Sequence, residues 1–296
     1  MITLINALVG LGTICAIDAS RNYEPWETDS ILEVMPHQEH HPYVFVGTSH
    51  VGAFALCQAN IQAVERATGA RVPIIARAAS GVFQHRLFLQ EYFDRGNTVD
   101  TVVYFVDPWC FFSRSWNEEM KYIEIEPLDR SFLMSMIREG VPLERIRAYA
   151  RTKTSYTWFR KPPFPPRDCN QTVAEVDPEL VAKRWKALYL DGESDAILDR
   201  YVRELFAMAE DLKARGTDVL LVIPPTLLGP PRGLPRLWPT LHACQSRYDI
   251  QTIDLSQAMS DPVLYSDLDH LNHSGIVALL NQHLLPALQS LDTLNE

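Results

Sequence analysis

The tetrapeptide Gly47-Thr48-Ser49-His50 is the first place in the chain where the residue types suggest chemistry. It follows a short apolar run and leads directly into a predicted helix, so the Ser49 hydroxyl is expected where a strand ends. The Ser49 N–H would lie at a helix N-terminus, where partial positive charge favours an anion, and Gly47 permits a tight turn. A serine at such a junction is more often a helix cap than a nucleophile, so this segment alone does not establish a catalytic site.

A complementary pair of residues lies near the C-terminus, in a predicted turn before the last helix. Asp267 precedes His270 by three residues. A carboxylate at this spacing can hydrogen-bond the imidazole and set its tautomer, which leaves the other ring nitrogen free to take a hydroxyl proton. His270 alone would be interpreted as a surface or capping residue. Together with Ser49, the pair predicts a Ser-His-Asp triad.

Metal binding is an alternative explanation for the histidines and carboxylates of these segments. Clusters of such side chains hold divalent metals, and two groups qualify: Asp267, Asp269, His270 and His273, and the separate group His37, His40 and His41. The second group lies in a proline-bounded stretch, where a solvated turn is commoner, and we expect no metal. His50 either lines the pocket beside Ser49 or faces solvent.

Five short apolar runs are expected to form the sheet that positions these residues. Each is mostly continuous rather than alternating, as in strands buried on both faces of a parallel sheet. The runs span residues 43–47, 72–77, 101–106, 218–223 and 250–255. Helices are predicted over 51–68, 196–215 and 274–291, and Pro286 is expected to kink or end the last of them. This alternation predicts an α/β fold, a three-layer αβα sandwich with right-handed crossovers.

The stretch 109–195 interrupts the strand–helix alternation between the third and fourth strands. It contains Trp109, Trp116, Trp158 and Trp185, and the run KPPFPP over 161–166. Because a structureless loop of this length is unusual inside a compact domain, we predict a largely helical insertion with an extended proline segment. Its aromatic residues either line a substrate cleft, with Trp109 as the candidate contact, or form a small satellite core.

With these residues in view, the chain resembles the SGNH or GDSL-like hydrolases. A serine directly after the first strand, together with a C-terminal Asp-x-x-His, is the arrangement typical of that family, whose Gly-Asp-Ser corresponds to Gly47-Thr48-Ser49. The resemblance covers about 43–106 and 218–288 and implies a flavodoxin-like sandwich with a five-stranded parallel sheet. The Gly-Thr-Ser variant with an apolar N-terminal segment is similar to the branch that acylates or deacylates cell-surface polymers, such as the alginate O-acetylation and D-alanyl transfer proteins.

The resemblance also implies an oxyanion hole, which this chain matches only in part. The family's glycine after the second strand corresponds to Gly81, and the Ser49 N–H is a further donor. The family's asparagine after the third strand is replaced by Asp107, and an ionised aspartate cannot donate a hydrogen bond to an oxyanion. Losing one such donor can cost on the order of 100- to 1,000-fold in rate.

The activity implied is that of a serine-dependent esterase or O-acyltransferase working through an acyl-enzyme on Ser49. The expected substrates are acylated carbohydrates or small esters, with water or a sugar hydroxyl as acceptor and a membrane acyl-donor protein as a partner, and no cofactor is needed. The alternative is a catalytically decayed binding or scaffold subunit of a membrane-associated complex, which the replacement at Asp107 favours and the intact Ser49, Asp267 and His270 argue against.

The composition argues against nucleic-acid binding. The formal net charge is −10, whereas nucleic-acid binders usually carry a basic patch, and the short basic clusters here lie among acids. The five cysteines are Cys15, Cys57, Cys110, Cys169 and Cys244. None forms a CxxC pair, so a zinc knuckle or thioredoxin motif is not predicted. The last four allow two disulfides in an exported domain or remain as scattered free thiols.

Three segments are expected along the chain: 1–22 as an apolar anchor or signal segment, 23–42 as a linker and 43–296 as the catalytic domain. Residues 2–17 are apolar or small except for Thr3, Asn6 and Thr13. This run is short for a membrane span and lacks the basic region of a signal peptide. A membrane anchor, a degenerate signal peptide and a buried first element all stay open. The favoured location is membrane-anchored or exported on the periplasmic side, with the cytoplasm as alternative.

Overall fold

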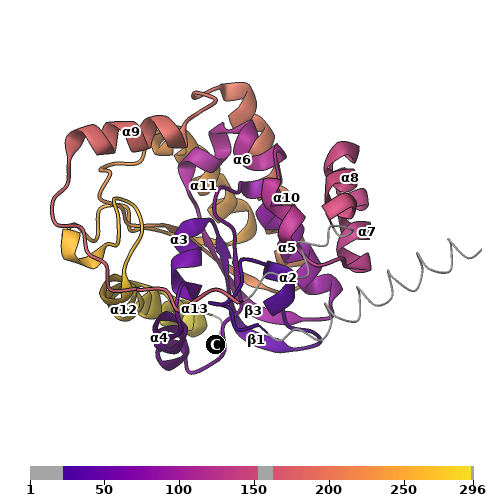
Figure 1. Cartoon of the computed structure of the whole chain (residues 1–296), viewed down its shortest axis with the longest axis horizontal. Helices are drawn as coiled ribbons and strands as arrows, with labels where there is room; N and C mark the ends of the chain where they lie inside the picture. Colours follow the sequence, from indigo (N-terminus) through magenta and orange to yellow (C-terminus); the bar gives the residue numbers. More distant parts are fainter. Residues whose placement is uncertain (1–22, 153–162, 295–296) are drawn as a thin grey trace, which may run out of the picture.

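The computed structural model describes residues 23–152 and 163–294. Five parallel strands form one sheet in the order β2-β1-β3-β4-β5, which confirms the predicted α/β sandwich with flavodoxin-like strand order (Figure 1). The strands are β1 (His40–Gly47), β2 (Ile74–Ala76), β3 (Thr98–Phe105), β4 (Asp218–Ile223) and β5 (Gln251–Asp254). The predicted strands match these positions, although β1 and β3 begin three residues earlier than expected.

The central strands are buried on both faces, as their continuous apolar runs require. Successive side chains of a strand point to opposite faces, so Val102 and Tyr104 of β3 join one core cluster while Val103 joins the other. All three side chains are at most 1% exposed. The sheet therefore separates two apolar cores, each covered by its own layer of helices.

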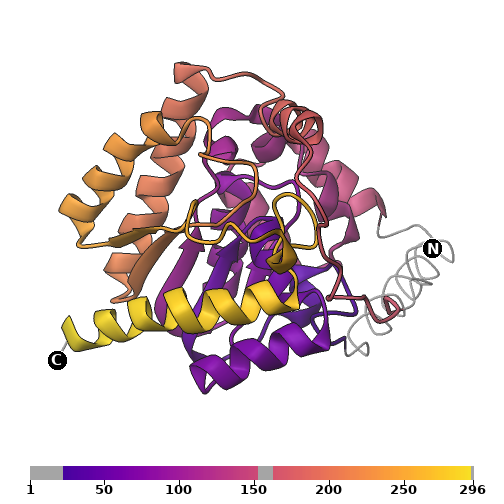
Figure 2. The same cartoon turned by 90° about the vertical axis from the view of Figure 1, so that its left-hand side faces the viewer.

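Two helical layers enclose the sheet. One face is covered by α4 (Gln58–Thr68), α12 (His273–Leu279) and α13 (Leu285–Leu294), and Figure 2 shows α4 lying beside the yellow C-terminal helices. The other face is covered by α5 (Val82–Asp94), α10 (Asp195–Ala214) and α11 (Leu234–Tyr248), which pack on one another and on the strands. The sequence thus folds into the three layers expected of it.

The predicted helix 51–68 is broken into three pieces, which corrects that prediction. The pieces are α3 (Ser49–Gly52), the 3₁₀-helix η1 (Ala53–Ala55) and α4. Cys57 separates the last two because its backbone is extended, with φ −148° and ψ 164°. Its sulfur is bonded to that of Cys169, so a covalent link to a distant segment coincides with the break.

The last helix contains a π-helical turn instead of ending at Pro286. The π-turn η6 (Leu280–Leu284) lies between α12 and α13, and Pro286 is the second residue of α13. A proline lacks the N–H for an intrahelical bond and its ring crowds the carbonyl four residues earlier. The wider π-turn accommodates this crowding, so the chain stays helical as far as Leu294.

The insertion between β3 and β4 is largely helical, as predicted. Its helices are η2 (Pro108–Phe112), α6 (Arg114–Glu118), η3 (Lys121–Ile125), α7 (Arg130–Arg138), α8 (Leu143–Thr152) and α9 (Pro178–Leu188). The segment 163–177 contains neither helix nor strand. Trp109 packs edge-on against Trp116 at 5.2 Å between ring centroids, and the Trp185 ring donates to Leu228 O. These tryptophans therefore belong to a core, and Trp158 lies outside the described residues.

The segment 23–42 is part of the folded domain and not the linker that its prolines suggested. It contains the short helix α2 (Ile31–Val34) and the first residues of β1. Ile31 and Leu32 are at most 5% exposed. The Leu32 N–H donates to the carboxylate of Glu126, which is itself fully buried. A partner 94 residues away thus orders a stretch that looks irregular in the sequence.

The predicted N-terminal anchor or signal segment, residues 1–22, lies outside the described residues. Within 23–152 and 163–294, no helix combines the length and apolar character needed to cross a membrane.

Candidate active site

Ser49 is held at the carboxyl edge of the sheet by the turn between β1 and α3. The Thr48 hydroxyl donates to Asp107 Oδ2 at 2.6 Å, which joins the ends of β1 and β3. Gly47 is required for this packing, because a Cβ there would lie 2.7 Å from Val51 Cγ2. β1 and β3 are the two strands between which the order of the sheet reverses, the place where ligands bind in open α/β sheets.

The loop before α12 holds Asp267 and His270 in a hydrogen-bonded turn. Asp267 Oδ1 accepts from the backbone N–H groups of Asp269 and His270, at 3.0 and 2.8 Å. The carboxylate also binds the ring, with His270 Nδ1 2.8 Å from Asp267 Oδ2. Burial opposes ionisation of Asp267, but the hydrogen bonds from His270 outweigh it and hold the pKa of the carboxyl below its ordinary value.

The structure brings Ser49, His270 and Asp267 together in the geometry of a Ser-His-Asp triad. His270 Nε2 lies 2.7 Å from Ser49 Oγ. With Nδ1 bonded to the Asp267 carboxylate, the imidazole carries its proton on Nδ1 and Nε2 accepts from the Ser49 hydroxyl. The distance is within the reach that a general base needs, so the arrangement can take the proton from Ser49.

A cavity of about 360 Å³ opens at these three residues. Its wall is largely apolar and includes residues of the 25–34 segment, which belongs to the stretch predicted as a linker. The apolar lining residues are Pro25, Ile31, Val34, Ala53, Ala55, Leu56, Ile74, Ala76, Ala78 and Leu271. Two arginines also border it, and both have partners: Arg77 pairs with Glu126 and Arg167 with Asp29.

The structure does not bring Gly81, the predicted oxyanion-hole glycine, to the wall of this cavity. Gly81 is buried and precedes α5. A Cβ at this position would lie 2.3 Å from the amide of Asn117, so the glycine is needed for close packing beneath the insertion.

Asp107 also occupies a place different from that of an oxyanion donor. The residue is 2% exposed, and its two carboxylate oxygens are taken by the Thr48 hydroxyl and by His50 Nδ1, the latter at 2.7 Å. It therefore anchors the turn on either side of Ser49 and presents no hydrogen to a substrate.

His50 and Trp109, the predicted substrate contacts, do not border the cavity that contains Ser49. They line a separate cavity of about 20 Å³ together with Trp185. The His50 side chain is only 9% exposed, so it neither lines the large cavity nor faces solvent. The hydrogen bond to Asp107 holds the His50 ring away from the large cavity.

An ion pair that the sequence did not reveal supports the loop that carries Asp267 and His270. Arg184 of α9 reaches Asp269 Oδ2 with both Nε and Nη2, at 2.9 and 2.7 Å. Asp269 is 3% exposed and its other oxygen lies 3.6 Å from His270 Nδ1. Asp269 was visible only as a candidate metal ligand, and nothing in the local sequence marks Arg184, which is 85 residues away.

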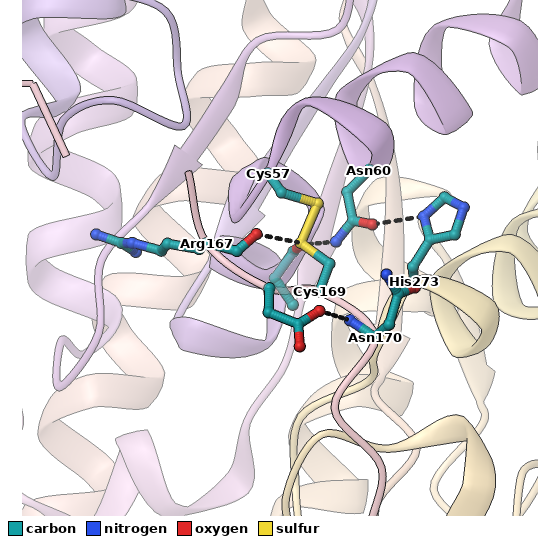
Figure 3. The surroundings of a disulfide bond; sticks show 8 residues. Cys57, Asn60, Arg167, Cys169, Asn170 and His273 are labelled. Atoms are coloured by element: carbon teal, nitrogen blue, oxygen red, sulfur yellow. Dashed lines mark hydrogen bonds between the residues drawn. A yellow bond between two sulfur atoms is a disulfide. The ribbon is translucent and has the colours of Figure 1, made fainter. Parts of the chain in front are cut away.

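The disulfide Cys57–Cys169 fastens the segment 163–177 across the site, and Figure 3 shows its surroundings. The His273 N–H donates to Cys169 O at 2.8 Å, and His273 Nδ1 binds Asn60 Oδ1 at 2.8 Å. The disulfide joins the extended segment to the start of α4, and the hydrogen bonds of His273 join both to the start of α12. The two other cysteines within the described residues, Cys110 and Cys244, are free and buried.

Among the described residues, His50, Asp269 and His270 have potential metal-ligand atoms within 4.8 Å of one another. Their existing contacts do not suit a metal. Both ring nitrogens of His270 are engaged, and Asp269 is ion-paired with Arg184. The other three candidate histidines each have a partner of their own. His37 contacts Arg95, His40 contacts Thr98 and His41 contacts Tyr92.

The amino-acid sequence of this chain does not match those of known proteins closely enough to assign a family. No protein-family model and no curated protein matches the chain. Among solved structures, one match is a candidate acylhydrolase from Bacteroides fragilis NCTC 9343, with 11% identity, a TM-score of 0.41, and coverage of 86% of this chain and 91% of that one. Since the two chains superpose so loosely, this likeness carries no argument about function.

Proposed function

We propose that this protein is a serine-dependent acyl-ester hydrolase or O-acyltransferase that works through an acyl-enzyme on Ser49. The observation that carries the proposal is the pair of hydrogen bonds from Ser49 Oγ to His270 Nε2, at 2.7 Å, and from His270 Nδ1 to Asp267, at 2.8 Å. A triad is recognised by this geometry and not by chain order, and it activates a hydroxyl that is otherwise a weak nucleophile.

The reaction proceeds in two halves. Ser49 Oγ attacks the acyl carbon while its proton passes to His270 Nε2, and the resulting oxyanion is stabilised by the Ser49 N–H. The bond from the acyl carbon to the leaving alcohol then breaks, and that alcohol takes the proton from His270. Water or a sugar hydroxyl next attacks the Ser49 ester and gives its proton to His270, which returns a proton to Ser49 Oγ as it leaves.

The cavity beside Ser49 supports an uncharged, apolar acyl group. Its volume of about 360 Å³ has room for roughly a dozen water-sized groups. The wall is largely apolar, and Arg77 and Arg167 are already paired with Glu126 and Asp29. A substrate carboxylate or phosphate would therefore find no free cation among these residues. The resemblance to the SGNH hydrolases suggests acylated carbohydrate or cell-surface polymer as the acyl carrier.

An exported, membrane-associated setting is also part of the proposal. The Cys57–Cys169 disulfide supports it, because disulfides persist in oxidising compartments such as the periplasm. The apolar run 2–17 would anchor the domain at the membrane, where an acyl-donor protein would be its partner.

Labelling with a fluorophosphonate probe tests the proposal directly, because the probe reacts with an activated serine. We expect stoichiometric labelling of the wild type and none of Ser49→Ala, with His270→Ala slowed by on the order of 1,000-fold or more. Equal labelling of the wild type and Ser49→Ala would overturn the assignment. A panel of short- and medium-chain esters, with and without sugar acceptors, then separates hydrolysis from transfer.

A second candidate function is a binding or scaffold subunit with a decayed site. The observation that favours it is the absence of Gly81 from the cavity wall, together with the use of Asp107 as an anchor for Thr48 and His50. Labelling of Ser49 without turnover of any ester in the panel would support this alternative.

A further inference from the structure

A second histidine–carboxylate pair lies directly behind the proposed triad. His50 Nδ1 is 2.7 Å from Asp107 Oδ1, and both side chains are buried. The rings of His50 and His270 have centroids 5.3 Å apart. Within the described residues, the buried His50 Nε2 has no hydrogen-bond partner. The His50 ring therefore packs against the ring of the proposed general base, and His50 does not line the large cavity.

Charged groups from three elements face His50. Asp107 follows β3, Asp269 comes from the loop before α12, and Arg184 reaches Asp269 from α9. Burial lowers the proton affinity of the ring, but the two carboxylates outweigh it and raise the pKa of His50 to about 9, while Arg184 opposes them. The raised pKa favours the imidazolium form of His50, whose Nδ1 contacts Asp107.

The geometry points to His50 as a positioning residue for the proposed reaction, a cation beside the ring of His270 that offsets the negative charge of the buried carboxylates around that base. Asp107 and Asp269 are both buried, and Asp269 Oδ1 lies 3.6 Å from His270 Nδ1. A buried carboxylate without a cationic partner would favour the protonated form of a neighbouring imidazole, and a protonated ring cannot act as a base. Arg184 is the ion-pair partner of Asp269, and His50 supplies the positive charge that offsets Asp107.

A positive charge on His50 accounts for the aspartate at position 107, where the resemblance implies an asparagine. An asparagine at position 107 would accept from Thr48 but would not hold an imidazolium at His50. The Asp107 carboxylate does both, and it receives hydrogen bonds from the residues on either side of Ser49. The pair is neutral as a unit, so removing one member changes the local charge whereas removing both does not.

The test measures the pH dependence of fluorophosphonate labelling of the full-length protein, and it rests on the proposed function. We expect His50→Gln to move the acid limb of the labelling rate to higher pH by about one unit. The double variant His50→Gln/Asp107→Asn removes both charges, and its acid limb is expected to return close to that of the wild type. If His50 had only a structural role, the acid limb of the double variant would lie further from that of the wild type than the acid limb of His50→Gln does.

Controls separate this inference from the proposed function and from misfolding. His242→Gln removes an exposed histidine that stacks on Trp238, and its acid limb is expected to coincide with that of the wild type. Arg184→Gln is a second variant, at a side chain 36% exposed, and is expected to shift the limb in the same direction as His50→Gln by a smaller amount. Thermal unfolding reports whether each variant folds.

Two outcomes overturn the role of His50 while leaving Ser49 as the nucleophile. One is an acid limb that is unchanged in His50→Gln, and the other is a double variant whose limb stays with that of His50→Gln. Failure of wild-type Ser49 to label would instead overturn the proposed function itself.

Discussion

The three consecutive side chains of Thr48, Ser49 and His50 have different partners. The outer two bind the carboxylate of Asp107 and the middle one binds His270. The chain leaves an extended strand and enters a helix here. Consecutive side chains therefore no longer alternate between the two faces of the sheet and point in different directions. At the scale of the residue, Asp107 therefore fixes the orientation of Ser49 through the residues on either side of it.

The pH dependence of stability should reveal the His50–Asp107 pair. The pKa of His50 is raised to about 9 in the folded protein, so its stabilisation is fully present below the unfolded pKa of 6.5 and is lost as the pH rises through 9. We expect the wild type to lose roughly 3 kcal/mol more unfolding free energy than His50→Gln between pH 6 and pH 10. Urea unfolding at a series of pH values measures this difference, and parallel curves for the two proteins would contradict it.

At the scale of the element, the loop before α12 is fastened at its end by Asn272. Its Oδ1 accepts from the Gly275 N–H at 3.0 Å and caps the helix, while its Nδ2 donates to Gln171 O and Val263 O. Gly275 packs so closely that a Cβ would lie 2.1 Å from Leu264 O. One side chain thus joins the helix, the loop and the extended segment 163–177.

Variants of Asn272 should separate capping from cross-linking of the loop. Asn272→Ala loses the cap and both donated bonds, and we expect it to lower the unfolding free energy by about 2–3 kcal/mol. Asn272→Asp keeps an oxygen for the Gly275 N–H and should lose less. Chemical unfolding of both variants measures the order, and an aspartate variant less stable than the alanine variant would show that capping is not the main contribution.

At the scale of the whole molecule, the Cys57–Cys169 bond joins the first crossover to the insertion. The two cysteines are 112 residues apart in the sequence. The enclosed chain includes β2, α5, β3 and most of the insertion. Closing so long a loop restricts the unfolded chain, and in the folded protein the bond holds 163–177 against α4 and the start of α12.

Removing this disulfide should weaken both stability and the site. We expect Cys57→Ser/Cys169→Ser to lose about 2–5 kcal/mol of unfolding free energy. Fluorophosphonate labelling should also slow, because the segment that carries Arg167 to the cavity is no longer fastened. Reductant should reproduce the loss in the wild type and have no further effect on the double variant. If reductant destabilised both proteins equally, another cause would be responsible.

The sequence by itself determined the order of the elements and the residues of the proposed triad. Continuous apolar runs predict buried parallel strands because both faces of such a sheet are covered. Ser49, Asp267 and His270 stand out because each lies where a strand or turn meets a helix, and a parallel sheet gathers those junctions at one edge. Such features can be predicted because the residues that cause each of them lie close together in the sequence.

Only the tertiary structure decided the surroundings of the site, because those depend on partners far apart in the sequence. The 25–34 segment becomes a cavity wall through Glu126, 96 residues beyond Ser30. His50 turns inward because Asp107 binds it. Gly81 is covered by Asn117. The helix after Ser49 breaks at Cys57, which forms a disulfide with Cys169. Burial and charge pairing, which no local pattern encodes, determine which side chains face a substrate.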